Sequence, residues 1–308
     1  MNALIRVGVL LLAASTCFAA KRGDIPFDDQ QVYPESITST SRGVVISGSI
    51  KGNIYRAGPR DAAMKTWIRP TTENGLQAVF GVFADERSQT LWACSATNPF
   101  AAPQEGARSD LVEFDLKTGK FKATYQLPAP KPICNDIAVA ANGDVYATDT
   151  PNGRIFRIKR GSKQLELFGE DEQLKGIDGI AFSGDGAMYI NIVFKGLLMR
   201  VERAADGRMG AIVQLKTKEP LGGPDGMRTI KGNRFLLAEG TAGRIDEVTI
   251  NGDQANIRVL RSGLNSSPGV TLVGKTVYTM EGKVNYLFDP TLKGQDPGSF
   301  KLIAVPLN

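Results

Sequence analysis

The sequence predicts an all-β protein that folds as a six-bladed β-propeller of four-stranded blades. One pattern, a strand followed by a turn and a returning strand, recurs six times along the chain. Its openings are Glu35, Phe80, Asn135, Asp178, Asp225 and Pro268, which are 45, 55, 43, 47 and 43 residues apart. A repeat of about 40–50 residues is typical of propeller blades, whereas a β-helix coil is shorter and a β-sandwich needs no repeat. After the N-terminal segment, no stretch shows sustained helical periodicity.

Each repeat supplies four candidate strands, separated by the Gly, Asn-Gly and Asp-Gly turns that are typical of hairpins. The first strands are expected at 35–40, 80–85, 135–140, 178–183, 225–230 and 268–273. The second strands are expected at 43–49, 90–96, 144–150, 187–193, 234–240 and 276–282. The third strands are expected at 52–57, 110–116, 153–159, 196–202, 243–249 and 283–289. Weaker fourth strands are expected at 64–69, 122–127, 164–168, 211–215, 256–260 and 301–307.

The second repeat is the longest because it contains the segment 97–110, which is rich in Pro, Gly and small residues. That composition predicts a loop. A connection of this length is either a lid over the mouth of the propeller channel or a solvated surface insertion. The sequence leaves both interpretations open.

The N-terminus reads as a secretory signal peptide. Arg6 precedes the apolar run 7–14 and a stretch of small residues, and cleavage is expected after Ala19. The remaining residues, 20–308, are expected to form one propeller domain in the periplasm or outside the cell. No later stretch is long and apolar enough for a membrane span.

Charge and composition restrict the chemistry. Loss of Arg6 lowers the net charge from +5 to +4, and no basic cluster indicates a nucleic-acid partner. The chain contains no histidine. This excludes Ser-His-Asp and Cys-His catalysis and any histidine-based zinc site. We therefore expect catalysis, if present, to use carboxylates or a metal held by oxygen, in a monomer.

The hairpin openings predict a ring of side chains. In a propeller the first strand of each blade lines the central channel, so six equivalent openings converge at one end of it. Four of them carry side-chain oxygens: Glu35, Asn135, Asp178 and Asp225. Each one alone is more simply a turn residue bonded to nearby backbone. Together they predict a divalent cation, because clustered carboxylates are costly without one. Oxygen ligands favour Ca²⁺, with Mg²⁺, Mn²⁺ and Zn²⁺ as alternatives.

Two cysteines remain after processing. Cys94 falls late in a second strand that runs back toward the ring, and Cys134 directly precedes Asn135 in the adjacent blade. The two can meet near the rim as a disulfide, which the secretory route permits. Two buried free thiols are the alternative.

Four stretches give the chain a resemblance to a known family. They are PESITSTSRGVVISGS, CNDIAVAANGDVYATDT, IDGIAFSGDGAMYI and GGPDGM. They resemble the calcium-dependent propeller lactonases of the senescence-marker-protein (regucalcin), gluconolactonase and luciferin-regenerating-enzyme family, and also the paraoxonase and strictosidine-synthase-like propellers. The resemblance implies that Glu35, Asn135 and Asp178 hold the metal, although the family usually has Asn at the third position. It also implies that Asp225 both binds the metal and acts as a base.

Several positions depart from that family. Ile133 stands where gluconolactonases often have an Arg that grips sugar hydroxyls, and the paraoxonase histidine pair has no counterpart. Glu281 is the nearest match to the late glutamate of strictosidine synthases, and we interpret it as a rim residue. Phe80 and Phe100 then indicate a more apolar substrate, which Asn135 also contacts. Asp136 is either a turn cap, the simpler interpretation, or a residue that supports the metal ligands.

The sequence thus predicts a secreted, metal-dependent hydrolase that opens a lactone or related ester. The cation would polarise the carbonyl, and Asp225 would take a proton from the attacking water. The alternative is a non-catalytic propeller that binds a ligand or protein and holds a structural ion in its channel.

Overall fold

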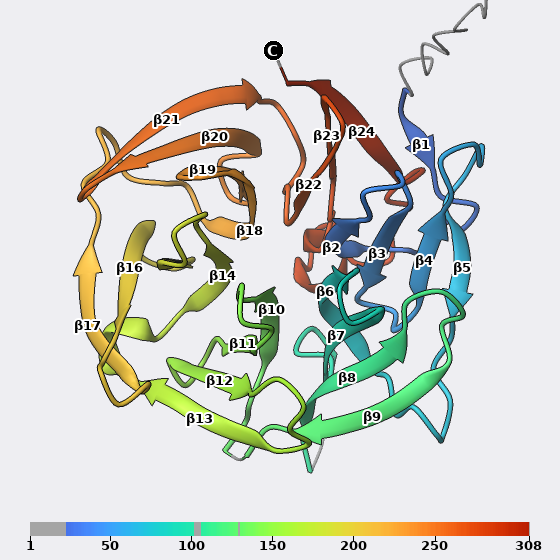
Figure 1. Cartoon of the computed structure of the whole chain (residues 1–308). Coiled ribbons are helices and arrows are strands. Elements are labelled where there is room, and N and C mark those ends of the chain that lie inside the picture. The colour runs from blue at the N-terminus through green and yellow to red at the C-terminus, as the bar shows by residue number, and fades with distance from the viewer. Residues whose placement is uncertain (1–22, 102–105, 129, 308) are drawn as a thin grey trace, which may run out of the picture.

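The computed structural model describes residues 23–101, 106–128 and 130–307. They form six four-stranded antiparallel sheets arranged as blades around a central channel (Figure 1). The predicted six-bladed propeller is therefore confirmed. The predicted signal peptide, 1–19, lies outside the described residues. No helix in the described part of the chain is both long and apolar enough to cross a membrane.

The first five blades follow the chain from the channel outward. Blade 1 contains β2 (Pro34–Ser39), β3 (Val45–Ser49), β4 (Ile54–Ala57) and β5 (Lys65–Ile68). Blade 2 contains β6 (Ala78–Asp85), β7 (Thr90–Ala96), β8 (Ser109–Asp115) and β9 (Phe121–Gln126). Blade 3 contains β10 (Cys134–Val139), β11 (Val145–Asp149), β12 (Arg154–Ile158) and β13 (Leu165–Glu170). Blade 4 contains β14 (Ile177–Phe182), β15 (Met188–Ile192), β16 (Leu197–Arg203) and β17 (Met209–Gln214), preceded by the short 3₁₀ helix Glu172–Leu174. Blade 5 contains β18 (Pro224–Lys231), β19 (Arg234–Glu239), β20 (Arg244–Asn251) and β21 (Gln254–Arg261).

The sixth blade joins the two ends of the chain. From the channel outward it contains β22 (Val270–Val273), β23 (Thr276–Met280), β24 (Lys301–Pro306) and β1 (Ile25–Pro26). Ile25 pairs with Leu302 across the outer edge, and β1 lies beside β24 in Figure 1. The N-terminal strand thus closes the ring with backbone hydrogen bonds.

This closure corrects two strand predictions. The segment 283–289, expected as a third strand, contains the one-turn helix α1 (Asn285–Phe288) instead. The strand expected as the fourth, 301–307, occupies the third place as β24 and pairs with β23. The physical reason is that the distant β1 supplies the outermost strand, which local sequence patterns cannot reveal. The segment between β23 and β24 is therefore free to form a connection.

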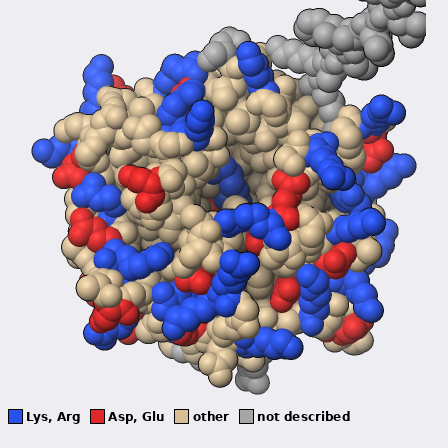
Figure 2. Space-filling model, in the orientation of Figure 1, with Lys and Arg blue, Asp and Glu red and all other residues tan. Residues whose placement is uncertain are grey.

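The hydrophobic core lies between neighbouring blades. Strands near the channel are almost wholly buried, as in β11 and β15, whereas the outermost strands β9 and β21 consist mainly of half-buried and exposed residues. Apolar residues from adjacent sheets pack together, for example Tyr146 and Ile155 of blade 3 against Ile180 and Ile190 of blade 4. Burial of this kind is the main stabilising contribution. On the face in Figure 2, acidic and basic side chains are mixed around a central hollow.

Candidate metal centre in the channel

The opening of the innermost strand is irregular in five of the six blades. The pairing register shifts between Pro34 and Ser36, Val79 and Val82, Cys134 and Ile137, Ile177 and Ile180, and Pro224 and Met227. Each shift brackets the hairpin opening of its blade. A β-bulge releases a residue from the ladder and redirects its side chain. The bulges therefore explain why these side chains can turn toward the channel.

The glycine that follows four of the openings has a packing role. A Cβ on Gly81 would lie 2.2 Å from the carbonyl oxygen of Asn135, and one on Gly179 would lie 2.3 Å from that of Asp225. A Cβ on Gly226 would lie 2.8 Å from the carbonyl oxygen of Pro268. In each case the glycine lets the blade approach the opening residue of the next blade. The recurring Gly thus sets the tight spacing of the ring.

The structure brings all six predicted ring positions together. Glu35, Phe80, Asn135, Asp178, Asp225 and Pro268 line one small cavity of about 10 Å³, together with Ser36, Gly81, Asp136 and Gly226. A space of this size accommodates one water-sized particle. Asp178 is buried, and Glu35, Asn135 and Asp225 each keep part of their surface open to the cavity.

The electrostatics of the ring are unfavourable without a cation. Burial, and then the negative charge of Asp136, raise the pKa of Asp178 to about 8. Burial and the charge of Asp178 raise the pKa of Glu35 and of Asp225 well above their usual values. The carboxyl groups therefore repel one another at a site that solvates them poorly.

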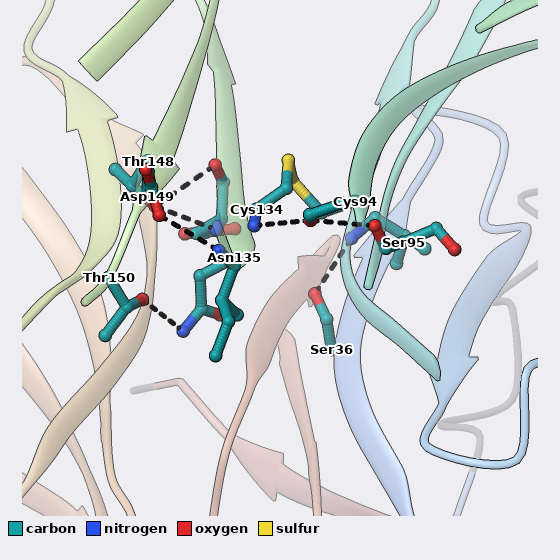
Figure 3. The surroundings of a disulfide bond; sticks show 12 residues. Ser36, Cys94, Ser95, Cys134, Asn135, Thr148, Asp149 and Thr150 are labelled. Atoms are coloured by element: carbon teal, nitrogen blue, oxygen red, sulfur yellow. Dashed lines mark hydrogen bonds between the residues drawn. A yellow bond between two sulfur atoms is a disulfide. The ribbon is translucent and has the colours of Figure 1, made fainter. Parts of the chain in front are cut away.

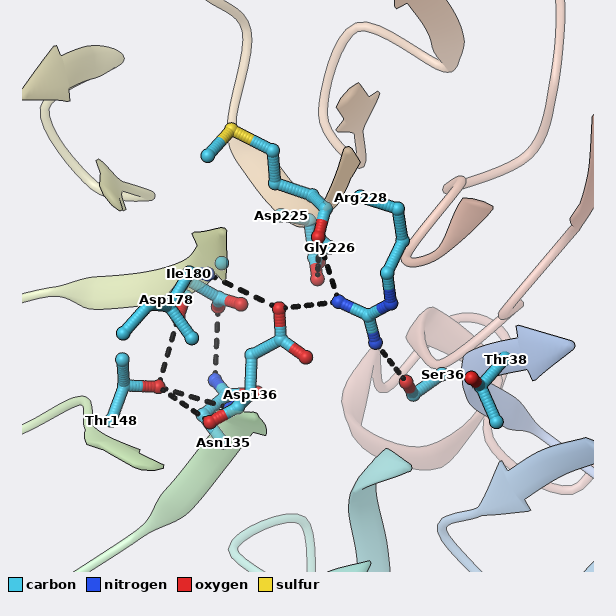
Figure 4. Close-up of polar contacts among 12 residues, drawn as sticks. Ser36, Thr38, Asn135, Asp136, Thr148, Asp178, Ile180, Asp225, Gly226 and Arg228 are labelled. Atoms are coloured by element: carbon cyan, nitrogen blue, oxygen red, sulfur yellow. Dashed lines mark hydrogen bonds and ion pairs between the residues drawn. The ribbon is translucent and has the colours of Figure 1, made fainter. Parts of the chain in front are cut away.

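Hydrogen bonds fix two of the ring residues. The Asn135 amide nitrogen Nδ2 donates to Asp178 Oδ2 and to Thr150 Oγ1, both at 2.9 Å (Figures 3 and 4). The Gly226 amide donates to Asp225 Oδ1 at 2.8 Å. Asp178 Oδ1, by contrast, is buried and has no hydrogen-bond partner among the described residues. The neighbouring Asp225 carboxyl can bond the Asp178 side chain only when one of the two acids carries a proton.

Asp136 and Arg228 form a buried ion pair beside the ring. Arg228 Nη1 lies 2.8 Å from Asp136 Oδ2, and the Ile180 amide donates to the same oxygen at 3.2 Å (Figure 4). Arg228 Nη2 also donates to the Val82 carbonyl at 3.2 Å. The sequence interpretation of Asp136 as an ordinary turn cap did not anticipate this pair. The available signal was Arg228, a charged residue that lies in an innermost strand between Met227 and Thr229.

The donor set suits a hard divalent cation. In residues 23–101, 106–128 and 130–307, no three Asp, Glu, His or Cys side chains form a ready-made metal group. The ring nevertheless offers carboxylate and amide oxygens from four blades, and one of its buried oxygens is unpartnered. Such oxygens are the usual ligands of Ca²⁺. Glu35, Asn135, Asp178 and Asp225 therefore fit a cation, and they are the residues that would hold it.

A disulfide lies directly beside the ring. Cys94 of β7 and Cys134 of β10 are bonded, with their Cα atoms 5.1 Å apart (Figure 3). Both are completely buried. The Cys134 amide also donates to Ser109 Oγ at 2.8 Å. The bond thus ties blade 2 to blade 3 at the residue before Asn135.

Two other candidate residues lie outside the small cavity. Phe100 stacks on Phe288 of α1, with ring centroids 5.7 Å apart, and is not among the residues that line the cavity. Part of its loop, 102–105, lies outside the described residues. Glu281 accepts a hydrogen bond from the Asn265 amide at 2.8 Å.

Comparisons with known proteins were made at the level of sequence and structure. No family model and no curated protein sequence matches the chain. A luciferin-regenerating enzyme superposes with a TM-score of 0.66 at 11% identity, covering 93% of this chain and 93% of that chain. The calcium-binding protein regucalcin from Agrobacterium tumefaciens gives a TM-score of 0.64 at 17% identity, covering 93% and 95%. Virginiamycin B lyase from Staphylococcus aureus gives 0.58 at 15% identity, covering 91% and 98%.

These similarities establish the propeller fold. Two of the neighbours, luciferin-regenerating enzyme and regucalcin, carry the names of the family that the sequence motifs resemble. The third neighbour, virginiamycin B lyase, has the same architecture and is named for a lyase activity. Because one fold hosts many functions, activity must be argued from the site itself.

Proposed function

We propose that the protein is a metal-dependent hydrolase that opens a lactone or a related ester. The observation that carries the proposal is the convergence of Glu35, Asn135, Asp178 and Asp225 on one cavity, with a buried Asp178 oxygen left unpartnered. The resemblance of the motifs to the propeller lactonases and the regucalcin-like fold support it.

The chemistry divides between the ion and the chain. A bound divalent cation, for which Ca²⁺ is the first choice, supplies polarisation of a carbonyl oxygen. Asp225 accepts a proton from water; burial and the neighbouring carboxylates raise its pKa in the metal-free site, and the cation would lower it and keep the carboxylate ionised. The Gly226 amide, which donates to Asp225 Oδ1 at 2.8 Å, keeps that side chain oriented. Asn135 and Phe80 would contact the substrate.

The absence of histidine separates this proposal from the lyase reaction. A catalytically inactive variant of virginiamycin B lyase has alanine in place of a histidine. This chain has no histidine, so that residue has no counterpart here. The proposed enzyme is a monomer, secreted or periplasmic after cleavage near Ala19, and acts on a small molecule.

A second candidate is a non-catalytic binding propeller with a structural ion. The small volume of the ring cavity, about 10 Å³, favours it, because an ion fits there and a substrate does not. Hydrolysis requires the substrate to approach the ring from the adjoining channel mouth.

A metal-replacement assay tests the proposal. The purified protein is stripped with a chelator and assayed on a panel of lactones and aryl esters, with Ca²⁺, Mn²⁺, Mg²⁺ or Zn²⁺ restored singly. We expect metal to restore hydrolysis in the wild type and not in Asp225→Asn, whereas the exposed-site control Asp185→Asn behaves as wild type. A metal-dependent rise in melting temperature without turnover on any substrate would favour the binding propeller.

A further inference from the structure

The far end of the channel contains a larger cavity. Its volume is about 470 Å³, within the range of small-molecule sites. Residues from the later part of all six innermost strands line it, including Ser39, Ala84, Val139, Phe182 and Thr271. None of the ring residues lines it. It is therefore a separate site at the opposite mouth of the propeller.

Arg228 separates the two cavities. Its side chain lines the large cavity, while its guanidinium bonds Asp136 at 2.8 Å and Ser36 at 3.4 Å, two residues that line the small one. Arg228 is about nine-tenths buried, and in the described part of the chain its enclosed Nε has no hydrogen-bond partner. Its charge is already paired with Asp136, so Arg228 contributes a polar wall to the large cavity and not a free donor.

A second arginine lies at the rim. Arg87 donates through Nη1 to the Ala141 carbonyl at 2.9 Å and through Nη2 to the Ala140 carbonyl at 2.8 Å. These bonds hold the guanidinium of blade 2 against blade 3 and leave other N–H groups free, because the group has five donors. Its side chain is 58% exposed. Arg87 is thus pre-positioned and still open to a ligand.

The lining has one sign of charge. The two arginines are accompanied by hydroxyl and apolar residues, and no Asp or Glu among the described residues lines the cavity. Asp136 neutralises Arg228 from outside the cavity, so Arg87 carries the charge that a ligand meets. The nearest acid to Arg87, Asp85, is 3.9 Å from its Nε and accepts a 2.6 Å bond from Ser88. A cleft with positive charge and low-dielectric walls concentrates anions.

The walls define the rest of the ligand. Phe83, Val139, Phe182 and Leu272 contribute apolar surface, and the Arg228 guanidinium lies 5.9 Å from the centre of the Phe83 ring. Two of the lining hydroxyls are already engaged, since Ser39 donates to the Leu272 carbonyl and Thr229 to the Phe182 carbonyl. The charged donors open to a ligand are therefore the remaining N–H groups of Arg87, and a guanidinium matches a carboxylate in geometry.

We propose that this mouth binds a small organic carboxylate whose apolar body packs against the Phe83 side of the cavity. The proposal is independent of hydrolysis at the metal centre, because it uses a different end of the channel. The carboxylate would lie at Arg87, whose guanidinium is exposed at the rim.

Binding of paired probes tests this site. Benzoate, phenylacetate, mandelate and hexanoate are titrated against the chelator-treated protein by ligand-observed NMR, each beside its uncharged amide. We expect at least one acid to bind and its amide to bind about tenfold more weakly or not at all, as expected for a lost charge-assisted bond. Failure of every acid to bind, or equal binding of acid and amide, would overturn the proposal.

Two matched substitutions locate the binding. Arg87→Gln should weaken the acid about tenfold, whereas Arg60→Gln, at an exposed arginine outside the cavity lining, should leave it unchanged. Ala141→Glu places a carboxylate at the exposed rim and should abolish binding, while Ala141→Gln, of similar size, should retain it. Equal effects within either pair would show that the acid binds elsewhere and would contradict the proposal.

Discussion

Arg228 of β18 and Asp136 of β10 form an ion pair across the channel, with Nη1 2.8 Å from Oδ2 (Figure 4). Their side chains are 11% and 4% exposed. The pair joins blade 5 to blade 3 and lies between the ring of Glu35, Asn135, Asp178 and Asp225 and the larger cavity. A buried pair of this kind is costly to break, because one charge is then left without its partner.

Removal of one partner should therefore destabilise the fold. We expect Asp136→Asn to lower the free energy of unfolding by about 3–5 kcal/mol, measured by urea denaturation. Asp136→Asn combined with Arg228→Met should recover part of that loss, since no charge then remains unpaired. The exposed pair of Arg208 and Asp206 provides the control, and Asp206→Asn should have little effect. Additive effects of the two channel substitutions would contradict direct coupling.

Calcium should stabilise the protein through the ring. At a Ca²⁺ concentration of 100 times the dissociation constant, binding adds about 2.7 kcal/mol to the unfolding free energy. Asp178→Asn should reduce the rise in melting temperature on adding Ca²⁺ to chelated protein. The same change should not lower the melting temperature of the metal-free protein, because it removes a poorly solvated carboxylate. An unchanged Ca²⁺ response in the variant would show that the charge of Asp178 contributes nothing to Ca²⁺ binding.

Gly179 should be intolerant of a side chain. In Gly179→Ala the new Cβ would meet the Asp225 carbonyl oxygen at 2.3 Å and Asn191 Nδ2 at 2.6 Å. We expect a loss of about 1–3 kcal/mol in unfolding free energy, as for other overpacked sites, and weaker Ca²⁺ binding. Gly58→Ala is the control, since its Cβ would meet only the Asp61 side chain, at 3.2 Å. If Gly179→Ala and Gly58→Ala unfold at similar urea concentrations, the blades can move apart at little cost in free energy.

The disulfide should contribute to stability through the unfolded chain. Cys94 and Cys134 are 40 residues apart, and cross-links typically contribute about 2–4 kcal/mol. The double variant Cys94→Ala/Cys134→Ala should therefore unfold at lower urea concentration than the oxidised wild type. Wild type that is unfolded with reductant should match the double variant. Coincident transitions with and without reductant would show that the bond contributes nothing.

Two buried acids of blade 5, Glu239 and Asp246, predict that the unfolding free energy depends on pH. In blade 5, Arg244 lies 2.7 Å from Glu239 and 3.3 Å from Asp246, and both acids are fully buried. Burial and the neighbouring Glu239 carboxylate raise the pKa of Asp246 from 3.8 to about 8. The folded protein therefore holds a proton that the unfolded chain releases above its ordinary pKa. Unfolding free energy should fall as the pH rises from about 4 to about 8.

Asp246→Asn should remove this contribution. The unfolding free energy of the variant minus that of wild type should increase with pH between pH 5 and pH 7. The increase should be at most about 1.4 kcal/mol per pH unit. Urea denaturation at several pH values measures the difference. Asp185→Asn serves as the control, because hydrogen bonding to Ser183 lowers the pKa of that exposed acid. Parallel pH profiles for Asp246→Asn and wild type would contradict the assignment.

The repeats in the sequence were sufficient to predict the propeller architecture and the residues that form the ring. The openings Glu35, Asn135, Asp178 and Asp225 occupy equivalent places in repeats of nearly constant length, so they meet wherever the repeats close into a propeller. The role of each ring residue as ligand, base or substrate contact stays a prediction. The following glycines were visible too, but only the packed blades show what they accommodate.

Tertiary structure decided the features that depend on contacts between distant segments. The strand Ile25–Pro26 completes the sixth blade by pairing with β24, and this freed the segment 283–289 to contain a helical turn. The Arg228–Asp136 pair and the larger cavity likewise exist only because separate blades face one channel. Local periodicity predicts most of the strands, because its pattern lies within a few residues. Ring closure, ion pairing across the channel and cavity charge are set by residues tens to hundreds of positions apart, and folding alone brings these together.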